Sequence, residues 1–400
     1  MFDRIRKLFA GPTTSNDPRT LFAIEIEALV STLPNVQTVT RSPDAFALDV
    51  TTPNGVQHRF FLDNAFDETR ELSPDDKLAR IAFMLSSLDE PIEKPAWDEA
   101  RETFVPVLRG ATYGIEIWAE QPNAMFVRRP FLPYVDELVG MDRRTSVEFV
   151  GRAALDWWNV TAEDLFAAST ARAHLLADPA VELYDKTHGP LWNVATNDTY
   201  ESSRLLVPGW LASFEGKVDG RPIAIVPERG TLMVGGDGRR TMIERLLDTA
   251  GREFGASNRR ISPVLYTADA QGKVVPYALP AGDALARKLR LAQEQLALYE
   301  HDTQKQVLER LYEERGLDVF VSSYQVFETD EGGMRSSTVW VKGVRTYMPR
   351  TERVILLTPG EGEGAKPKSV VDVAFEEVEE RLTRVDGLHP ERFETVEFPE

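Results

Sequence analysis

A dense polar run at residues 197–204 holds the most closely spaced chemical groups of the chain. It contains two carboxylates, a phenol and a guanidinium, on Asp198, Glu201, Tyr200 and Arg204. Such a set suits a small ligand or a peptide. Arg204 would pair with an anionic group, a carboxylate would accept a proton and Tyr200 would donate a hydrogen bond. The run therefore predicts a binding or catalytic site.

The same residues also have a concrete structural interpretation. Residues 200–214 favour a helix, which Asp198 would cap at its N-terminus while Glu201 completes a capping box. Arg204 would then form an ion pair with Glu201 or Asp198 on the helix surface. Both interpretations stay open, since the N-terminus of a helix also binds anions.

Two residues outside the run are candidate members of the same site. Arg109 ends an apolar strand, and His188 lies in a loop before the run, where it is a candidate general base. A lone loop histidine is more often structural, so both interpretations of His188 stay open. The glycine-rich loop at 235–238 lacks the residue order of phosphate-binding loops, and a tight turn with Asp237 as a helix cap explains it.

Several reaction classes lack their sequence signatures. The chain contains no cysteine, which excludes disulfides, thiolate nucleophiles, zinc-thiolate and iron-sulfur sites. Its five histidines are too scattered for paired metal ligands, and it has neither a G-x-S-x-G elbow nor an S-x-x-K motif. We therefore expect no metal site and no cofactor.

Length and charge bound the class of protein. The chain has 400 residues, 42% of them hydrophobic, and a formal net charge of -18. This length suggests two or three globular domains, and the acidity argues against nucleic-acid binding, which uses basic patches. No segment approaches the apolar length of a transmembrane helix, and the basic N-terminal stretch lacks the apolar core of a secretory signal. We expect a cytoplasmic protein.

Helices and strand pairs alternate along the predicted N-terminal domain. Residues 21–33 favour a helix, residues 45–50 and 56–62 form the two arms of a hairpin, and Ser73 caps a second helix. A proline-rich break at 91–95 follows this helix. The first domain is therefore predicted at residues 1–95.

The rest of the chain divides into a central domain at 96–280 and a C-terminal domain at 281–400. The C-terminal domain begins with a long helix at 285–311 and ends in a helix that Ser369 and Asp372 would cap. The predicted fold class is α+β. It consists of repeated helix, strand-pair and helix units, with helices packed on antiparallel or mixed sheets.

The central domain resembles an uncharacterised bacterial family, the YtpQ-like family, also known as domain of unknown function 1444. The matching pieces follow the order expected of the family and lie at 106–109, 131–138, 197–206, 223–227 and 261–276. Together they cover roughly residues 104–279. The resemblance implies a recurring fold unit and a bacterial setting, and it implies no reaction.

Three elements favour contact with a partner protein. Residues 1–10 are expected to form a short amphipathic helix, which would contact a partner or a membrane surface or, as is more usual for so short a helix, dock on its own domain. The 285–311 helix has coiled-coil spacing over about two heptads. Residues 359–400 form an acidic tail with twelve acidic and five basic residues. Our lead hypothesis is a non-enzymatic binding or scaffolding protein, and the alternative is a small-ligand sensor or enzyme with its site at Asp198–Arg204.

Overall fold

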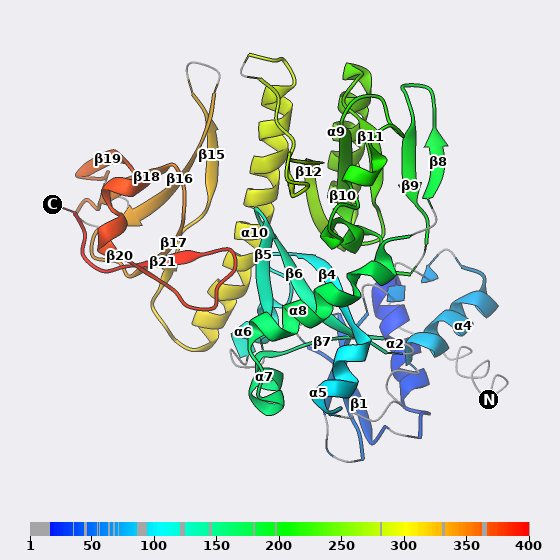
Figure 1. Ribbon diagram of the computed structural model, residues 1–400. Coiled ribbons are helices and arrows are strands. Elements are labelled where there is room, and N and C mark those ends of the chain that lie inside the picture. Colours follow the sequence, from blue (N-terminus) through cyan, green and yellow to red (C-terminus); the bar gives the residue numbers. More distant parts are fainter. Residues whose placement is uncertain are drawn as a thin grey trace. The chain divides into compact units, whose positions relative to one another are not determined.

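The computed structural model divides the chain into two units (Figure 1). Unit 1 spans Met1–Ala96 and Asp142–Glu148, and unit 2 spans Trp97–Met141 and Phe149–Glu400. The structure describes residues 17–34, 36–43, 46–53, 55, 57–62, 65–66, 69–70, 72–85, 94–120, 125–143, 146–178, 181–196, 198–280, 282–329, 333–361 and 366–399. The predicted amphipathic helix at 1–10 lies outside these residues.

The described part of unit 1 follows the predicted order of helix, hairpin and helix. It contains α2 (Pro18–Val30), β1 (Thr38–Arg41), β2 (Ala47–Thr51), β3 (Gln57–Phe61) and α4 (Pro74–Leu85), and the three strands form an antiparallel sheet. Asp17 caps α2 by accepting the Thr20 backbone N–H at 2.9 Å. Ser73 accepts the Asp76 N–H at the start of α4, as predicted.

Unit 2 contains a six-stranded antiparallel sheet. Its spatial order is β13 (Val274–Pro276), β12 (Arg260–Ala268), β10 (Pro222–Glu228), β11 (Met233–Gly236), β9 (Leu191–Val194) and β8 (Val181–Asp185). Helix α9 (Arg240–Ala256) packs on this sheet and buries Met242, Ile243 and Leu246, whose spacing places them on one helical face. The apolar spacing along α9 therefore explains why this helix lies on the sheet.

Asp237 does not cap α9, and that prediction is wrong. The N-cap residue of α9 is Arg239, which makes no side-chain cap hydrogen bond. Asp237 instead accepts the Arg221 backbone N–H at 2.7 Å and the Arg221 guanidinium at 2.8 Å, beside the β10–β11 pair. The glycines of this loop allow close packing, because a Cβ at Gly236 would collide with the backbone of Asp219.

A second sheet carries short helices around it. Its strands are β4 (Phe104–Gly110), β6 (Val135–Asp142) and β5 (Arg128–Leu132), and β7 (Val147–Phe149) follows β6 along the chain. The surrounding helices and 3-10 turns are α5 (Trp97–Ala100), η2 (Arg101–Thr103), α6 (Ile115–Glu120), α7 (Arg152–Trp158), α8 (Ala162–Arg172) and η4 (Ala173–Leu176). Helix α8 packs on β4. Thr161 and Asp164 form a capping box at the start of α8.

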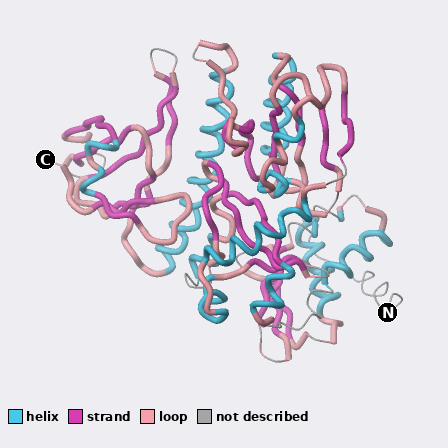
Figure 2. The backbone as a smooth tube through the Cα atoms, viewed as in Figure 1, coloured by secondary structure: helices cyan, strands magenta, loops and turns pink. Residues whose placement is uncertain are grey.

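The C-terminal part of unit 2 contains two four-stranded sheets (Figure 2). One has the order β14 (Phe320–Val321), β17 (Thr346–Pro349), β21 (Arg392–Thr395) and β20 (Leu382–Arg384), and the other β15 (Gln325–Glu328), β16 (Met334–Val341), β18 (Arg353–Thr358) and β19 (Ser369–Ala374). The β14–β17 and β16–β18 pairs are parallel, and the others are antiparallel. With these sheets, the chain has an α+β fold.

The predicted final helix is a strand followed by 3-10 turns, so that prediction is wrong. Ser369 begins β19, which pairs with β18 over its whole length, and the turns are η7 (Phe375–Glu377) and η8 (Glu379–Arg381). The segment is rich in valine, which fits a pleated strand better than a helix. The tail at 359–400 is therefore part of a folded sheet region where it is described.

Helix α10 (Ala286–Glu314) confirms the predicted long helix. It packs against α6, α9 and β12 and against β14 and β15, so it joins the sheets of unit 2 (Figure 1). Its buried side chains include Leu289, Leu296 and Leu308, but also the polar residues Glu300 and His301. None of the described helices is both long and apolar enough to cross a membrane.

Candidate functional site

The segment Asp198–Arg204, named here the polar segment, does not begin an α-helix. It leads into η5 (Ser202–Leu206), and η6 (Ala212–Phe214) follows as another 3-10 turn, so the predicted helix at 200–214 is wrong. Thr199 adopts a left-handed φ of 67°, which interrupts any helix there. Asp198 accepts the Tyr200 backbone N–H at 2.9 Å, a turn that competes with helix formation. Glu201 completes no capping box.

Arg204 forms the ion pair with Asp198, one of the two partners predicted for it. Its two terminal nitrogens reach the two carboxylate oxygens at 3.0 and 2.5 Å, a bidentate geometry. The Arg204 side chain is buried. Partial burial opposes ionisation of Asp198, but the hydrogen bonds from Arg204 and from the Tyr200 N–H outweigh it and lower the pKa of Asp198.

Glu201 is buried beside this ion pair and bonds elsewhere. Its Oε1 accepts the Thr196 hydroxyl at 3.3 Å. Three atoms of the polar segment are buried without a hydrogen-bond partner among the described residues: Glu201 Oε2, Ser202 Oγ and Arg204 Nε. Ser203 accepts the Leu108 backbone N–H at 3.1 Å and so attaches the segment to β4. The polar segment is thus mainly an interior turn held by its own neighbours.

The two further predicted site residues have different surroundings. Arg109 is buried on β4, donates to the Leu108 carbonyl at 2.7 Å and lies over the ring of Tyr113. Burial lowers the pKa of Arg109, while nearby Tyr113 and Tyr200 oppose the shift, so the structure brings Tyr200 near its charge. His188 lies half-buried in the β8–β9 turn, and no interaction described for it reaches the polar segment.

The predicted partner-binding elements are only partly visible. The 285–311 region forms most of α10, whose buried face packs inside unit 2 while Leu291 and Leu298 are exposed. The acidic tail contributes β19, β20 and β21 to sheets. A protein partner for these elements stays a prediction.

A second set of buried polar residues, which the sequence interpretation missed, lies on α10. Ala297, His301, Gln304, Leu308 and Leu311 are all buried and follow one another by steps of four and three along one helical face. The two polar members thus occupy positions that helical periodicity assigns to the core. Polar residues at core positions of a long helix were the sequence signal of a site.

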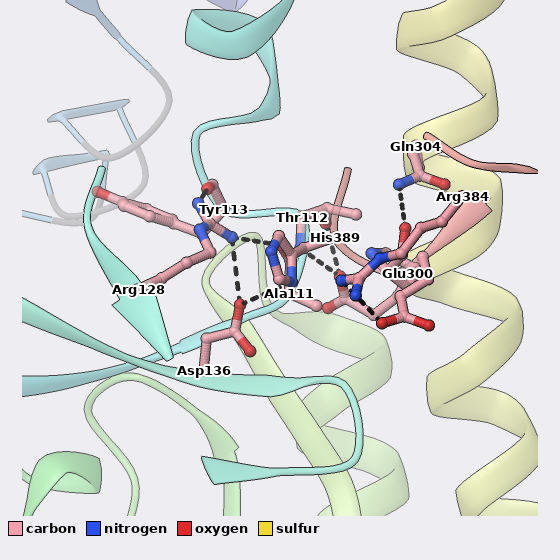
Figure 3. A network of polar contacts seen from close by, with 11 residues as sticks. Ala111, Thr112, Tyr113, Arg128, Asp136, Glu300, Gln304, Arg384 and His389 are labelled. Carbon is pink, nitrogen blue, oxygen red and sulfur yellow. Dashed lines mark hydrogen bonds and ion pairs between the residues drawn. The ribbon is translucent and has the colours of Figure 1, made fainter. Parts of the chain in front are cut away.

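Glu300, next to His301, holds the loop that follows β4. Its Oε2 accepts both the backbone N–H and the hydroxyl of Thr112, each at 2.7 Å (Figure 3). A Cβ at Gly110 would collide with the Glu300 carboxylate, so glycine permits this approach. Burial raises the pKa of Glu300 to about 7, the Thr112 bonds oppose the rise, and the nearby Asp136 adds to it.

Arg128 holds the same loop from the side of β5. It donates to the carbonyls of Ala111 and Tyr113, both at 2.5 Å, and to Asp136 Oδ2 at 3.3 Å (Figure 3). Burial raises the pKa of Asp136 to about 6, although the Arg128 guanidinium opposes the rise. His389 Nδ1 lies 4.0 Å from the same Asp136 oxygen. Side chains from β5, β6, α10 and the connection between β20 and β21 therefore meet around this loop.

Three side-chain rings pack together next to Glu300. They belong to Tyr134, His301 and Tyr324, named here the ring triad. The Tyr134 hydroxyl lies 3.3 Å from His301 Nε2, and the two rings meet edge to face. Tyr324 stacks on the ring of His301, with ring centroids 4.9 Å apart. The Tyr324 hydroxyl donates to Glu294 at 2.8 Å, which fixes the second tyrosine.

The ring triad separates three cavities. One of about 570 Å³ is lined by Tyr134 and His301, one of about 240 Å³ by Tyr134 and Tyr324, and one of about 310 Å³ by His301 and Tyr324. The largest is within the size range of small-molecule sites. Its walls come from β5, the β5–β6 turn, α10 and the segment 384–391. Each ring of the triad therefore lines two of the three cavities.

His301 has hydrogen-bonding capacity that the described protein leaves unused. The residue is 3% exposed, and its Nδ1 is buried without a hydrogen-bond partner among the described residues. Burial, followed by the charge of Arg392, keeps the pKa of His301 well below its ordinary value, so the ring is neutral near pH 7. A neutral ring has one donor and one acceptor nitrogen. The Tyr134 hydroxyl can serve only one of them.

The backbone at Tyr134 is strained. Its φ is 61°, in the left-handed region that bulky side chains rarely adopt. Pro133 precedes it in the β5–β6 turn, and the ring lies between two cavities. Strained backbone of this kind concentrates at ligand clamps and active sites. The conformation places the Tyr134 hydroxyl against His301.

No group of three or more His, Asp or Glu side chains in the described residues is arranged to hold a metal ion. The ring triad and the Glu300 network instead offer a phenol, neutral imidazoles and carboxylic acids. Burial raises the pKa of Tyr134 to about 12, and Glu294 and Glu300 add to this rise, so the phenol stays protonated at neutral pH. The chemistry available combines hydrogen bonding by the neutral rings with the charges of Arg128 and Asp136.

The chain matches no family model, no curated protein and no solved structure. Its function is therefore inferred from the geometry of the ring triad and the cavities beside it.

Proposed function

We propose that this protein binds a small molecule, which occupies the 570 Å³ cavity beside Tyr134 and His301. The observation that carries the proposal is the buried Nδ1 of His301, which lacks a partner among the described residues and belongs to a residue lining that cavity. A buried polar atom without a hydrogen bond costs about 1–3 kcal/mol. The atom is covered in the structure, so a ligand that bonds to it first displaces a neighbouring side chain, and the recovered energy offsets part of that cost.

The proposal replaces the location of the predicted ligand site and keeps its class. In the alternative hypothesis, a sensor or enzyme site lay at the polar segment, where Asp198 and Arg204 instead neutralise each other. A binding protein without a reaction also agrees with the lead hypothesis of a non-enzymatic role. Membership of the YtpQ-like family and a cytoplasmic location remain parts of the proposal that rest on the sequence.

A thermal-shift screen of metabolites against the full chain tests the proposal. A ligand that binds only the folded state at about one hundred times its Kd stabilises by about 2.7 kcal/mol. At least one compound should raise the Tm of the wild type by several degrees. The shift should be lost in His301→Phe, which keeps the ring but removes both nitrogens. His174→Phe is the matched control, since His174 is an exposed histidine elsewhere on unit 2.

Two results would contradict the proposal. The first is a screen in which no compound shifts the wild type. The second is a compound that shifts His301→Phe as much as the wild type. Tyr134→Phe separates binding from folding, because it removes only the hydroxyl and leaves the ring and the turn in place.

A further inference from the structure

The 570 Å³ cavity carries positive charge in a strongly acidic chain. Lys273, Arg350 and Arg384 line it, against the two carboxylates Asp136 and Glu391. His301 and His389 also line it, and both have lowered pKa values, so they are neutral near pH 7. The whole chain has a formal net charge of -18. The cavity lining therefore has the opposite sign to the protein.

Both carboxylates of the cavity are already paired. Asp136 accepts a hydrogen bond from Arg128, and Glu391 lies 2.8 Å from Arg384. The guanidinium of Arg384 keeps donors beyond those that one carboxylate uses. Lys273 is exposed, and no described carboxylate lies within ion-pair distance of its Nζ. Arg350 is also paired, because its guanidinium donates to Glu379 at 2.7 Å. Lys273 and the donors of Arg384 that Glu391 leaves unused are therefore the groups of this cavity that can hold an anion.

The lining of the cavity also includes apolar residues. Phe131, Leu132, Pro133, Pro390 and Ala111 contribute to it, and Leu132 and Ala111 are buried. Proline and aromatic surfaces of this kind suit the body of a ring or a short hydrocarbon. Charge and apolar surface are therefore combined in one cavity.

We infer that the ligand of this cavity is an organic anion, with an apolar body and one carboxylate or phosphate group, held by Lys273 and Arg384. The inference rests on the proposed function and adds the class of ligand. The anionic group pairs with the two cations and the body lies against Phe131 and Leu132. A hydroxyl on the body bonds to His301 Nδ1 after displacing the side chains that cover this atom. Carboxylate and phosphate share this recognition chemistry, because both accept hydrogen bonds from cationic donors.

Isothermal titration of the full chain with four matched probes tests the inference. The probes are benzoate, phenyl phosphate, benzyl alcohol and benzylamine, which have the same ring and differ in charge. The anions should bind at least tenfold more tightly than the alcohol, because hydrogen bonds to a charged acceptor are stronger than those to a neutral one. Tenfold corresponds to about 1.4 kcal/mol. The tighter of the two anions identifies the carboxylate or the phosphate. Added salt should weaken both.

Lys273→Gln supplies the residue-level test. It removes an exposed cation, so the fold should be unaffected, and anion binding should weaken about tenfold while benzyl alcohol binding stays the same. Lys186→Gln is the matched control, an exposed lysine in the β8–β9 turn. A fifth probe, 4-hydroxybenzoate, should bind more tightly than benzoate to the wild type but not to His301→Phe.

The outcomes separate the class of ligand from the proposed function. If benzylamine or benzyl alcohol binds as tightly as the anions, the anion inference is overturned while the cavity remains a ligand site. Failure of all the probes overturns the anion inference as well, and the metabolite screen then decides the proposed function alone. Anion binding that Lys273→Gln leaves unchanged overturns the assignment to this cavity.

Discussion

The polar segment and the ring triad both bury polar side chains, but their partners lie at very different distances along the chain. Asp198 bonds to groups two and six residues away. Tyr134 meets His301 across 167 residues, and Thr112 meets Glu300 across 188. Near partners make a turn that pairs its own charges. Distant partners make cavities lined by separate elements. Buried atoms without a described partner occur in both regions, three in the polar segment and His301 Nδ1 in the ring triad, but of these residues only His301 also lines the cavities described here.

The pKa values of carboxyl groups also shift in opposite directions in the two regions. Hydrogen bonds from Arg204 lower the pKa of Asp198 despite its partial burial, whereas burial raises the pKa of Glu300 despite the two bonds from Thr112. Asp198 therefore stabilises the fold as an anion, and Glu300 favours the protonated form. Variants of Asp198 and of Glu300 should therefore change the pH dependence of stability in opposite directions.

The largest effect is expected at Glu300. Its pKa is about 7 in the folded protein against an ordinary value of 4.5, so the folded state holds a proton that the unfolded chain releases. Ionisation of Glu300 should lower the free energy of unfolding as pH rises from about 4.5 to 7, by on the order of 3 kcal/mol. Glu300→Gln does not ionise and should remove this contribution, while the contributions of Asp136, His301 and His389, whose pKa values are also shifted, remain in both curves. Urea unfolding from pH 4.5 to 8 measures it, and parallel curves for variant and wild type would contradict it.

The next largest effect is expected for Asp198→Asn, which leaves the Arg204 guanidinium buried without its carboxylate. Removing one partner of a fully buried pair costs about 3–5 kcal/mol, and we expect about 2–3 because the Asp198 side chain is 37% exposed. The loss of stability should be present near pH 7 and shrink as pH falls below about 3.8, because the unfolded carboxyl is protonated there before the folded one is. Denaturant titration of this variant and of the exposed control Asp156→Asn measures the difference.

A smaller effect of opposite sign is expected at Thr199. Its left-handed φ strains a β-branched residue, and glycine should relieve the strain. Thr199→Gly should raise the free energy of unfolding by up to about 1 kcal/mol, whereas Thr199→Ala should give no gain. Tyr134→Gly relieves similar strain but deletes the ring against His301, so it should lower stability. If both glycine variants stabilise the protein equally, the Tyr134 ring has no packing role.

The smallest effect on stability is expected for His301→Phe. The new ring can still stack on Tyr324, and the buried nitrogen without a described partner is removed along with the Tyr134 contact. The stability gained by removing this nitrogen and the stability lost with the Tyr134 contact should offset each other to within about 1 kcal/mol, while ligand binding is lost. Denaturant unfolding beside the thermal-shift screen compares the two properties. A loss above about 2 kcal/mol would show that His301 serves mainly to hold the fold.

Local signals in the sequence predicted most of the elements. Helical spacing and a capping serine located α4, and turn chemistry between two alternating runs located the β2–β3 hairpin. The prediction failed where distant pairing decides the structure. Ser369–Ala374 carries a plausible cap, but β18 pairs with it along its full length and makes it a strand. The helix expected at 200–214 was lost to a side-chain turn at Asp198.

The candidate site was largely beyond the reach of sequence patterns. The polar run attracted attention because its groups are adjacent, and adjacency is also what lets Asp198 and Arg204 neutralise each other. The residues of the ring triad are separated by long intervals, and Tyr134 is positioned by a strained turn that no residue pattern indicates. Only His301 and Gln304, polar residues at core positions of α10, carried a usable signal.

The bond between Glu300 and Thr112 also sets an order of events during synthesis on the ribosome. The loop after β4 is made first, but the carboxylate that accepts its N–H and hydroxyl is added 188 residues later. At about 5–20 residues per second, that interval lasts roughly 10–40 s. Throughout it, the nascent chain carries β4 and its loop without this anchor. The ring triad and its cavities are completed only after α10 and Tyr324 have been added.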